Sequence, residues 1–271
     1  MKILILLMSC NNWFFKKEEE VVKNTWLKPV IDGQYPEVDW YFYTTGERNL
    51  IDKQNHVIYV NSNDNWDSTF LKTKLAFKIA KENLNYDYIV RTNLSTYVNL
   101  NLLVSTINFY IAPNNDKHVW GMELCNHKDT FYLIGKFLIF NKDDVDTIIN
   151  SSPMFDTQVD ADDYVYGCVF NDKDKYDLFK ACYASPRLGS LLTYNRIDDY
   201  LLSCIAISYR VYTFDGWDEE LSHRAIDEFK LAYKIDKFFK EHPQLTQKDF
   251  IECISYKNEY CFYNGIGTKR L

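Results

Sequence analysis

The sequence predicts an α/β fold with a mostly parallel central sheet, and three segments of the N-terminal half carry that prediction. Ile3 to Met8 is apolar on both alternations, which is typical of a strand buried on both faces. Ser68 to Asn83 repeats Leu or Ile every four residues, a helical spacing, with Lys residues on its other faces. The apolar strand Tyr88 to Val90 follows directly. A strand, a helix and a strand in this order favour a right-handed crossover between parallel strands.

Further elements alternate along the chain in the same way. Glu18 to Leu27 has helical character, and Pro29 is expected to end that helix. Short strands at Trp40 to Tyr43 and at Val57 to Val60 lead into polar turn residues. In the second half we expect strands at Val119–Trp120, Phe131–Phe140 and Val211–Phe214, and helices at Lys142–Asn150, Asp162–Phe170 and Ser222–Lys240.

The chain shows no internal repeat, low-complexity linker or composition shift that would mark a domain boundary. We therefore expect a single domain over residues 1–271, with residues 215–271 forming a helical C-terminal extension. A length of 271 residues is sufficient for a substantial core. The hydrophobic content of 46% and the charged content of 25% are ordinary for a soluble globular protein.

Charge and hydropathy exclude two classes of partner. The formal net charge is −7, and the Lys and Arg residues are scattered rather than gathered in a basic stripe, so we expect no nucleic acid partner. No segment approaches the roughly 18 consecutive apolar residues that a membrane span needs, so we expect no integral membrane contact.

Cysteine usage and the N-terminus predict a cytoplasmic protein. The 7 cysteines form no CxxC pair and no regular framework, which is typical of reduced thiols and argues against zinc. The apolar run after Met1-Lys2 superficially resembles a signal peptide, but it is too short for the usual hydrophobic region, and a buried strand fits better. Richness in Asn, Lys, Ile and Tyr hints at an AT-rich genome, and we expect a bacterial or viral protein.

Five segments carry recognisable motifs. VVKNTWL (Val21 to Leu27) resembles the pattern AIRxTW, and DNWDSTFLKT (Asp64 to Thr73) resembles DSYRNLTLKT. YIVRTNLSTYVNL (Tyr88 to Leu100) resembles VLKTDDDVFVN, with Asn-Leu-Ser in place of the acidic triad. DDYVYG (Asp162 to Gly167) resembles EDVYVG, and SHRAIDEF (Ser222 to Phe229) is similar to a late segment that contains His and Arg.

In this order, the motifs resemble those of the β-1,3-glycosyltransferase and Fringe-type families. The resemblance covers residues 1 to 170 well and the remainder faintly. It implies the GT-A fold, a Rossmann-like α/β/α sandwich with a mostly parallel sheet. It also implies a glycosyltransferase that moves a sugar from a nucleotide-sugar, with UDP-sugar as the default donor, to a hydroxyl of a glycan or glycoconjugate acceptor.

Such a transfer needs a base that takes the proton of the acceptor hydroxyl. The resemblance points to Asp163, with Asp162 beside it. The alternative is that both residues only cap the helix that they begin. Attack assisted by a single carboxylate implies inversion at the anomeric carbon, by the geometric logic that separates inverting from retaining glycosidases.

The leaving diphosphate needs positive charge, and here the chain departs from the family. The family's acidic triad ligates Mn²⁺ or Mg²⁺, and hard cations prefer carboxylate oxygens. Asn93 and Ser95 offer only neutral oxygens, so they are weak metal candidates and we expect metal independence. Basic side chains would then contact the diphosphate: Lys23, Lys72, Arg91, His223 and Arg224. A solvated helix face is the alternative for Lys72, and a simple surface helix start is the alternative for His223 and Arg224.

The remaining expected donor contacts are Ser9, Asn11, Asp64 and Thr92, together with Asn93 and Ser95. Trp120, Trp217 and Tyr164 are candidates for stacking on a sugar, with core packing as the alternative for each. A second interpretation of the chain is a degenerate relative that binds a sugar or nucleotide without turnover. The missing acidic triad favours it, whereas retention of Asp163 argues against it. The lack of a Gly-rich loop after the first strand argues against dinucleotide-binding and P-loop enzymes.

Overall fold

The computed structural model describes residues 1–65, 68–114, 119–121, 124–127, 130–133, 137–152, 162–170, 176–178, 181–183, 208–210, 232–243 and 263–264. All structural statements below concern these residues.

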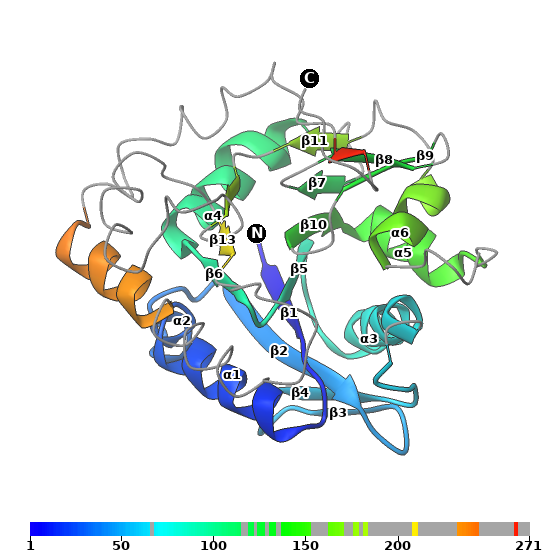
Figure 1. Cartoon of the computed structure of the whole chain (residues 1–271), viewed down its shortest axis with the longest axis horizontal. Coiled ribbons are helices and arrows are strands. Elements are labelled where there is room, and N and C mark those ends of the chain that lie inside the picture. The colour runs from blue at the N-terminus through cyan, green and yellow to red at the C-terminus, as the bar shows by residue number, and fades with distance from the viewer. Residues whose placement is uncertain are drawn as a thin grey trace.

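The centre of the molecule is an 8-stranded sheet in the order β11-β7-β10-β5-β1-β2-β4-β3 (Figure 1). Its strands are β1 (Ile3–Met8), β2 (Val38–Thr45), β3 (Leu50–Asp52), β4 (Val57–Val60), β5 (Tyr88–Asn93), β7 (Val119–Gly121), β10 (Phe137–Asn141) and β11 (Tyr176–Leu178). β1 pairs in parallel with both β2 and β5, and β2 pairs in parallel with β4. Of the strands that the structure describes in this sheet, β3 and β10 run against the others. The predicted α/β fold with a mostly parallel central sheet is confirmed.

Two small sheets accompany the central one. The first has the order β12-β13-β6 and the second the order β14-β8-β9. Their strands are β6 (Thr96–Val98), β8 (Leu124–His127), β9 (Thr130–Leu133), β12 (Ala181–Tyr183), β13 (Ser208–Arg210) and β14 (Tyr263–Asn264). Because β6 follows β5 after two residues, its sheet lies next to the carboxyl end of β5.

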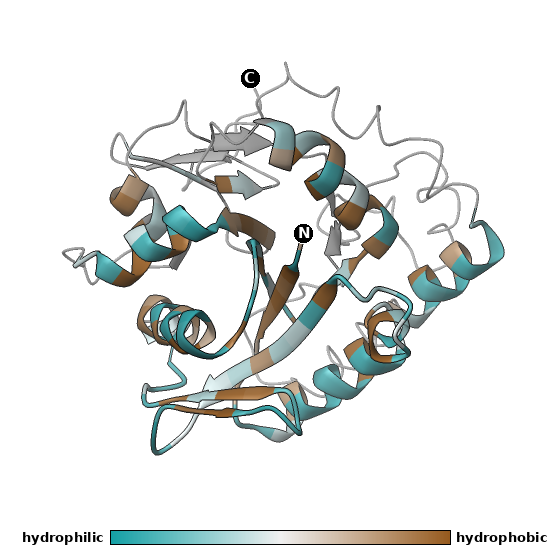
Figure 2. Ribbon diagram, turned by 180° about the vertical axis from the view of Figure 1, so that it is seen from behind, coloured by the Kyte–Doolittle hydropathy of each residue, from teal (hydrophilic) through white to brown (hydrophobic). Residues whose placement is uncertain are grey.

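Helices cover both faces of the central sheet (Figure 1). On one face lie α1 (Trp13–Asn24), α2 (Lys28–Ile31), α4 (Leu100–Thr106), the π-helix η2 (Ile107–Ile111), the 3₁₀ turn η3 (Ala112–Asn114) and a helix at residues 232–241. On the other lie α3 (Thr69–Asn83), α5 (Lys142–Asn150) and α6 (Asp162–Phe170). The strands in the middle are largely hydrophobic, whereas the helices turn hydrophilic residues outward (Figure 2).

The alternation of β1 divides the core into two parts. Ile3, Ile5 and Leu7 face α1, α2 and α4 in what we call the α1-side core. Leu4 and Leu6 face α3, α5 and α6 in the α3-side core. Successive side chains of a strand point to opposite faces. A strand that is apolar at every position is therefore one that is covered on both sides, as the sequence predicted.

The first helix differs from its predicted bounds at both ends. It begins at Trp13 rather than at Glu18, because the Asn12 side chain caps it and accepts a hydrogen bond from the Phe15 N–H at 3.1 Å. It ends at Asn24, and Pro29 does not close it. Pro29 lies instead in the first turn of α2, where its missing N–H is tolerated.

Other boundaries were also predicted incompletely. The expected strand at Phe131–Phe140 is two strands, β9 and β10. The expected strand at Val211–Phe214 lies outside the described residues, as do residues 222–231 of the expected helix at Ser222–Lys240. The described part of that helix ends at residue 241.

The helix at residues 232–241 packs against the rest of the protein through one buried face. Its buried residues Ala232, Ile235, Phe238 and Phe239 belong to the α1-side core. The Phe239 ring stacks on Tyr97 of β6 with 6.0 Å between ring centroids. The extent of a single domain with a C-terminal extension at 215–271 stays a prediction.

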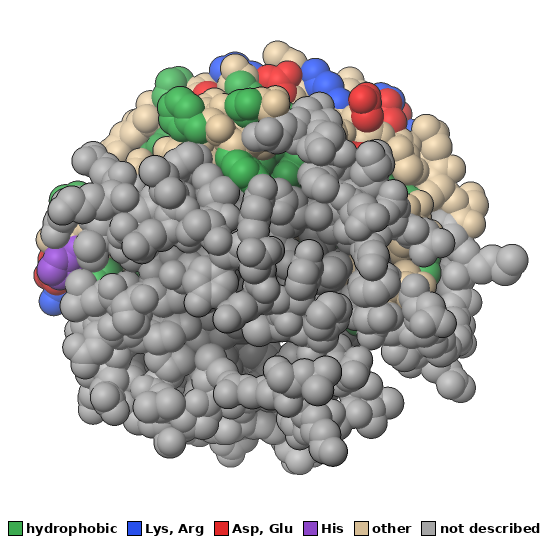
Figure 3. All heavy atoms as spheres, turned by 90° about the horizontal axis from the view of Figure 1, so that it is seen from above, with side chains coloured by type: hydrophobic (Ala, Val, Ile, Leu, Met, Phe, Trp, Pro, Cys, Tyr) green, Lys and Arg blue, Asp and Glu red, His purple; other side chains and the backbone are tan. Residues whose placement is uncertain are grey.

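The described helices and the described surface bear on contact with membranes and on charge. None of the helices in the described part of the chain combines the length and the apolar character that crossing a membrane requires. Figure 3 shows Lys and Arg side chains next to Asp and Glu side chains along the rim that described residues form in that view. Neither sign of charge dominates that rim.

Candidate functional site

The sheet has a switch point at β1. From β1 the chain builds β2 and β4 on one side, and it then returns to place β5 on the other side. In open α/β sheets, ligands bind outside the carboxyl ends of the strands where the strand order reverses in this way. The carboxyl ends of β1 and β5 lie together, because Met8 is the register partner of Asn93. We call residues 8–12 and 93–95 the switch-point edge.

A buried lysine holds the end of β1 from the α3 side. Lys72 of α3 is 2% exposed, and its Nζ lies 2.5 Å from Asp64 Oδ1. The same ammonium donates a hydrogen bond to the Ser9 carbonyl and lies 3.8 Å from Cys10 Sγ. The alternative of a solvated helix face for Lys72 is therefore wrong, and its expected contact with the diphosphate stays a prediction. Lys72 is a core residue whose charge is compensated by Asp64.

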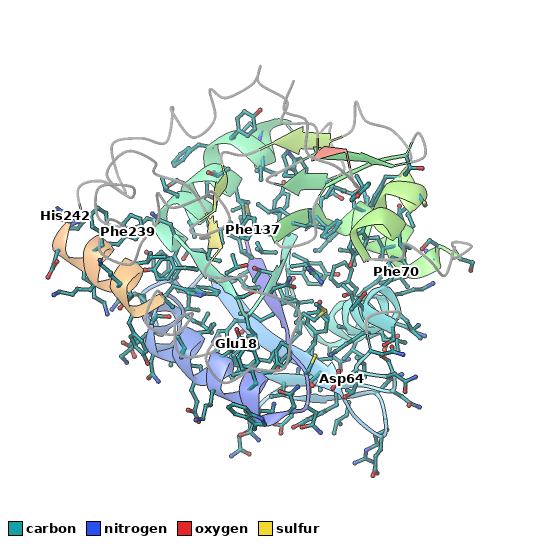
Figure 4. The ribbon with its side chains drawn as sticks, in the orientation of Figure 1. Glu18, Asp64, Phe70, Phe137, Phe239 and His242 are labelled. Carbon is teal, nitrogen blue, oxygen red and sulfur yellow. The ribbon has the colours of Figure 1, made fainter. Side chains whose placement is uncertain are left out.

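The second carboxylate oxygen of Asp64 binds Asn11, which lies in the loop that follows β1. Asp64 Oδ2 accepts hydrogen bonds from the Asn11 N–H and from Thr45 Oγ1, each at 2.8 Å. Burial alone raises the pKa of Asp64, but the hydrogen bonds from Asn11, Lys72 and Thr45 outweigh it and lower the pKa below its ordinary value. Asp64 lies beside the end of β2 (Figure 4). We call this arrangement the Asp64–Lys72 clamp.

A second contact holds Ser9 from the α1 side. The Ser9 hydroxyl donates to Glu19 Oε1 at 2.5 Å, and Lys16 Nζ lies 2.9 Å from the same oxygen. Both Ser9 and Glu19 are buried. The loop after β1 is thus fixed from both faces of the sheet, by Glu19 on one and by the clamp on the other. A rigid loop of this kind can position a ligand precisely enough for chemistry.

Cys10 lies within this network as a free thiol. Burial raises its pKa, and the Lys72 ammonium only partly opposes that effect. A thiol with a raised pKa is a poor nucleophile near neutral pH. Cys10 therefore contributes to the shape of the switch-point edge rather than to covalent chemistry.

Arg91 lies beneath the edge rather than on it. It is 1% exposed, its Nε donates to the Tyr43 hydroxyl at 3.3 Å, and its Nη2 lies 3.3 Å from Met8 Sδ. Tyr43 in turn bonds Thr73 of α3 at 2.9 Å. Arg91 places a positive charge close to the end of β1 from inside the α3-side core.

The uncharged triad occupies the end of β5 and the turn after it. Leu94 is buried in the α1-side core, whereas Asn93 and Ser95 are partly exposed. Within the described residues, the buried Oδ1 of Asn93 has no hydrogen-bond partner. This oxygen can accept a hydrogen bond from a water molecule or from a ligand hydroxyl. Thr92 is fully buried beside it.

The donor set at this edge does not fit a hard divalent cation. Asn93 and Ser95 carry no charge, and Mn²⁺ and Mg²⁺ prefer carboxylate oxygens. Among the residues that the structure describes, no cluster of three or more His, Cys, Asp or Glu side chains could hold a metal ion. We therefore derive no catalytic step through a metal.

Several predicted site residues lie elsewhere or outside the described part. Lys23 is in the last turn of α1, with its Nζ 5.1 Å from the centroid of the Phe42 ring. Trp120 is 0% exposed and packs against Tyr88, so of its two expected roles core packing holds. Outside the described residues lie His223, Arg224 and Trp217, and also the side chains of Asp162, Asp163 and Tyr164.

The backbone of Asp162 and Asp163 begins α6, as predicted. One turn later, Tyr166 packs on Phe70 in the first turn of α3, with 5.5 Å between ring centroids. Phe70 lies two residues before Lys72 in α3 (Figure 4). This contact places α6 on the same face of the sheet as the Asp64–Lys72 clamp.

Sequence reasoning missed two residues near the edge. Glu19 lies in a run of three glutamates, a pattern that is typical of a solvated helix face and does not indicate which of the three are buried. Trp13 is 56% exposed and begins α1 immediately after the loop. The signal for Trp13 was the preceding Asn12, which has the helix-capping preference that marks a helix start.

A separate depression lies between the ends of α5 and α6. Its volume is ≈ 540 Å³, and it is lined by Asp146, Thr147, Asn150, Ser151, Ser152, Cys168 and Val169. Among the described residues, this lining includes none of the predicted site residues.

No protein-family model matches the sequence, and no curated protein matches it at a significant level. Among solved structures, the chain is similar to a glycosyltransferase involved in the glycosylation of the major capsid of PBCV-1, with 11% identity, a TM-score of 0.48, and coverage of 84% of this chain and 99% of that one. It is similar to the galactosyltransferase LgtC in complex with donor and acceptor sugar analogues (10% identity, TM-score 0.40, coverage 85% and 95%). It is also similar to the glycosyltransferase GlyE of Streptococcus pneumoniae TIGR4 (10% identity, TM-score 0.45, coverage 90% and 64%). These values are too low to carry an argument about residues, donor or acceptor.

Proposed function

We propose that this protein is an inverting glycosyltransferase of the GT-A type that binds a nucleotide-sugar, by default a UDP-sugar, at the switch-point edge. The observation that supports this proposal most is the convergence of predicted donor contacts there. Ser9, Asn11, Asp64 and Lys72 form one hydrogen-bonded network at the end of β1. Asn93 of the neighbouring strand lies in register with Met8.

The catalytic step needs a base on the acceptor side of the donor. Asp163 is the proposed base, and it would take the proton of the acceptor hydroxyl as that oxygen attacks the anomeric carbon. The packing of Tyr166 against the first turn of α3 supports this role, because it brings α6 into contact with the helix that carries Lys72. The nucleoside diphosphate leaves from the opposite side of the anomeric carbon, which gives inversion.

The leaving diphosphate is proposed to be stabilised without a metal. Arg91 contributes long-range positive charge from beneath the edge, because a buried guanidinium cannot lose its proton. The Lys72 charge is already paired with Asp64, so its main contribution is to fix the loop. Lys23, His223 and Arg224 stay in the proposal as possible diphosphate contacts. We further propose a glycan or glycoconjugate acceptor and a cytoplasmic location in a bacterial or virus-infected cell.

The second candidate function is a degenerate relative that binds a nucleotide-sugar without turnover. One specific observation favours it: Lys72 and Arg91, two of the proposed diphosphate contacts, are buried and already engaged. A site with little free positive charge would bind a donor but accelerate departure of the diphosphate poorly.

Binding and turnover separate these functions. Thermal unfolding with a panel of nucleotide-sugars is expected to show one donor that raises the melting temperature by about 5 °C or more near 100 times its Kd. Donor turnover is then measured with Mn²⁺ and with EDTA, and we expect activity in both. Strict dependence on Mn²⁺ would refute the metal-independent mechanism. Binding without transfer or slow hydrolysis over hours would favour the degenerate relative.

The proposed base is tested by a matched pair of variants. Asp163→Asn is expected to lower kcat by about 10²- to 10⁴-fold while leaving the donor-induced melting shift unchanged, because a base acts in the transition state. Asp162→Asn, the adjacent control, is expected to keep most of the turnover. If Asp163→Asn kept full turnover, the assignment of the base would be wrong.

A further inference from the structure

Trp13 is an exposed aromatic residue that directly follows residues 8–12 of the switch-point edge in the chain. It is the first residue of α1 and follows the N-cap Asn12 directly. The residue is 56% exposed and belongs to neither part of the core, although its neighbour Phe14 is buried. A large ring in this position stabilises the fold little, because its apolar surface stays in water.

The ring is nevertheless held in place. The Asn12 N–H bonds the Cys10 carbonyl at 2.9 Å, and the Asn12 side chain caps the helix. The edge of the ring packs on Phe14 with 6.1 Å between centroids and 88° between planes. Lys17, one helical turn further on, places its Nζ 5.5 Å from the ring centroid over one face. A preordered ring loses little entropy when a ligand stacks on it.

The neighbouring polar groups are engaged in holding the loop. Asp64 Oδ1 is paired with Lys72, and Oδ2 accepts from Asn11 and Thr45. The Asn11 N–H is used in the same network. A nucleobase at this edge therefore does not replace these bonds without breaking the Asp64–Lys72 clamp. We therefore propose that Asp64 acts mainly by holding the loop, and its expected contact with the donor stays a prediction.

We infer that Trp13 stacks on the nucleobase of the nucleoside diphosphate donor, an inference that rests on the proposed function. α1 and α6 lie on opposite faces of the sheet (Figure 1). The proposed base Asp163 begins α6, so the reacting sugar lies toward α6 and the nucleobase toward α1. Stacking acts on the π-face that every base has, whereas hydrogen bonds distinguish base edges. Stacking on Trp13 therefore favours a planar base, and this contact by itself distinguishes weakly between different bases.

The test is a calorimetric titration of the full chain with UDP, GDP, ADP and inorganic pyrophosphate. Trp13→Ala is expected to weaken binding of each nucleoside diphosphate about tenfold, and Trp13→Phe to retain most of the affinity. The affinity for pyrophosphate is expected to be the same in Trp13→Ala and wild type. The matched control is Phe109→Ala, which removes a ring that is 72% exposed on η2, and it should leave all four titrations unchanged.

The outcomes separate this inference from the proposed function. If wild type binds nucleoside diphosphates and Trp13→Ala binds them equally well, the stacking role is overturned while the proposed function stands. If Trp13→Ala changes the preference of wild type for UDP over both GDP and ADP by more than about 100-fold, weak discrimination by the Trp13 contact is overturned. If wild type binds none of the three, the proposed function fails and the inference with it.

Discussion

Replacing Asp64 by Asn removes the carboxylate that compensates the buried ammonium of Lys72. The side chain of Lys72 is 2% exposed and that of Asp64 is 26% exposed, so the two partners differ in access to water. Breaking a buried ion pair from one side costs about 3–5 kcal/mol, because the remaining charge is left uncompensated. Asp64 is partly solvated, so screening lowers the figure, and we expect Asp64→Asn to cost about 3 kcal/mol.

The reverse substitution, Lys72→Met, should cost less. It leaves behind a carboxylate that water reaches and that keeps its hydrogen bonds from Asn11 and Thr45. We expect a loss of about 1–2 kcal/mol, mainly from the unpaired Ser9 carbonyl and the altered packing. The double variant should lose less than the sum of the two single variants, since neither uncompensated charge is then present.

The measurement is the free energy of unfolding in urea at pH 7 for wild type and the three variants. The reasoning is refuted if Lys72→Met costs as much as Asp64→Asn, or if the double variant equals the sum. The pH dependence gives a second check. The pKa of Asp64 is lower in the folded protein, so its stabilisation is present above the unfolded pKa of about 3.9 and is lost as pH falls through the folded pKa. Asp64→Asn should lack this part of the acid-induced loss.

Three further predictions concern other residues. Burial raises the pKa of Asp144 to about 8, so the free energy of unfolding should fall as pH rises from about 4 to 8. The variant Asp144→Asn should show a smaller decrease of melting temperature over this pH range. An unchanged decrease would contradict this prediction. Saturating UDP should slow alkylation of Cys10, measured by mass spectrometry, but not that of the exposed Cys168; equal rates with and without UDP would count against the site. Gly46→Ala places a Cβ 2.9 Å from Tyr59 Cβ, which is closer than two carbon atoms normally approach. The substitution should lower the free energy of unfolding, measured in urea, by about 1–3 kcal/mol. A variant as stable as wild type would disprove the clash.

Sequence patterns predicted the elements whose signals are local. Ile3 to Met8 is β1 with the predicted bounds, because a strand covered on both faces is apolar at every position. Lys142 to Asn150 is α5, and its cap Asn141 accepts from the Asp144 N–H. β5, in contrast, continues past Val90 to Asn93. Its polar residues stay in the sheet because they pair with Leu6 to Met8 of β1, a partner that the local pattern of β5 does not show.

The structure brings four of the predicted site residues together, whereas their roles in binding stay predictions. Ser9, Asn11, Asp64 and Lys72 do converge, because they follow or adjoin strands whose carboxyl ends share one edge. The burial of Lys72 could not be predicted from its helix, where lysines recur on the outer faces. It depends on Asp64, which tertiary packing brings to the end of β1. The exposure of Trp13 likewise depends on where α1 begins.

The location of the donor is the central claim, and hydrogen–deuterium exchange tests it most directly. Exchange is measured by mass spectrometry with and without the nucleotide-sugar that gives the largest melting shift. We predict slower exchange in peptides that cover residues 8–13 and 91–99, which contain the ends of β1 and β5. Saturated binding that protects only the depression between α5 and α6, and leaves those peptides unchanged, would contradict the account.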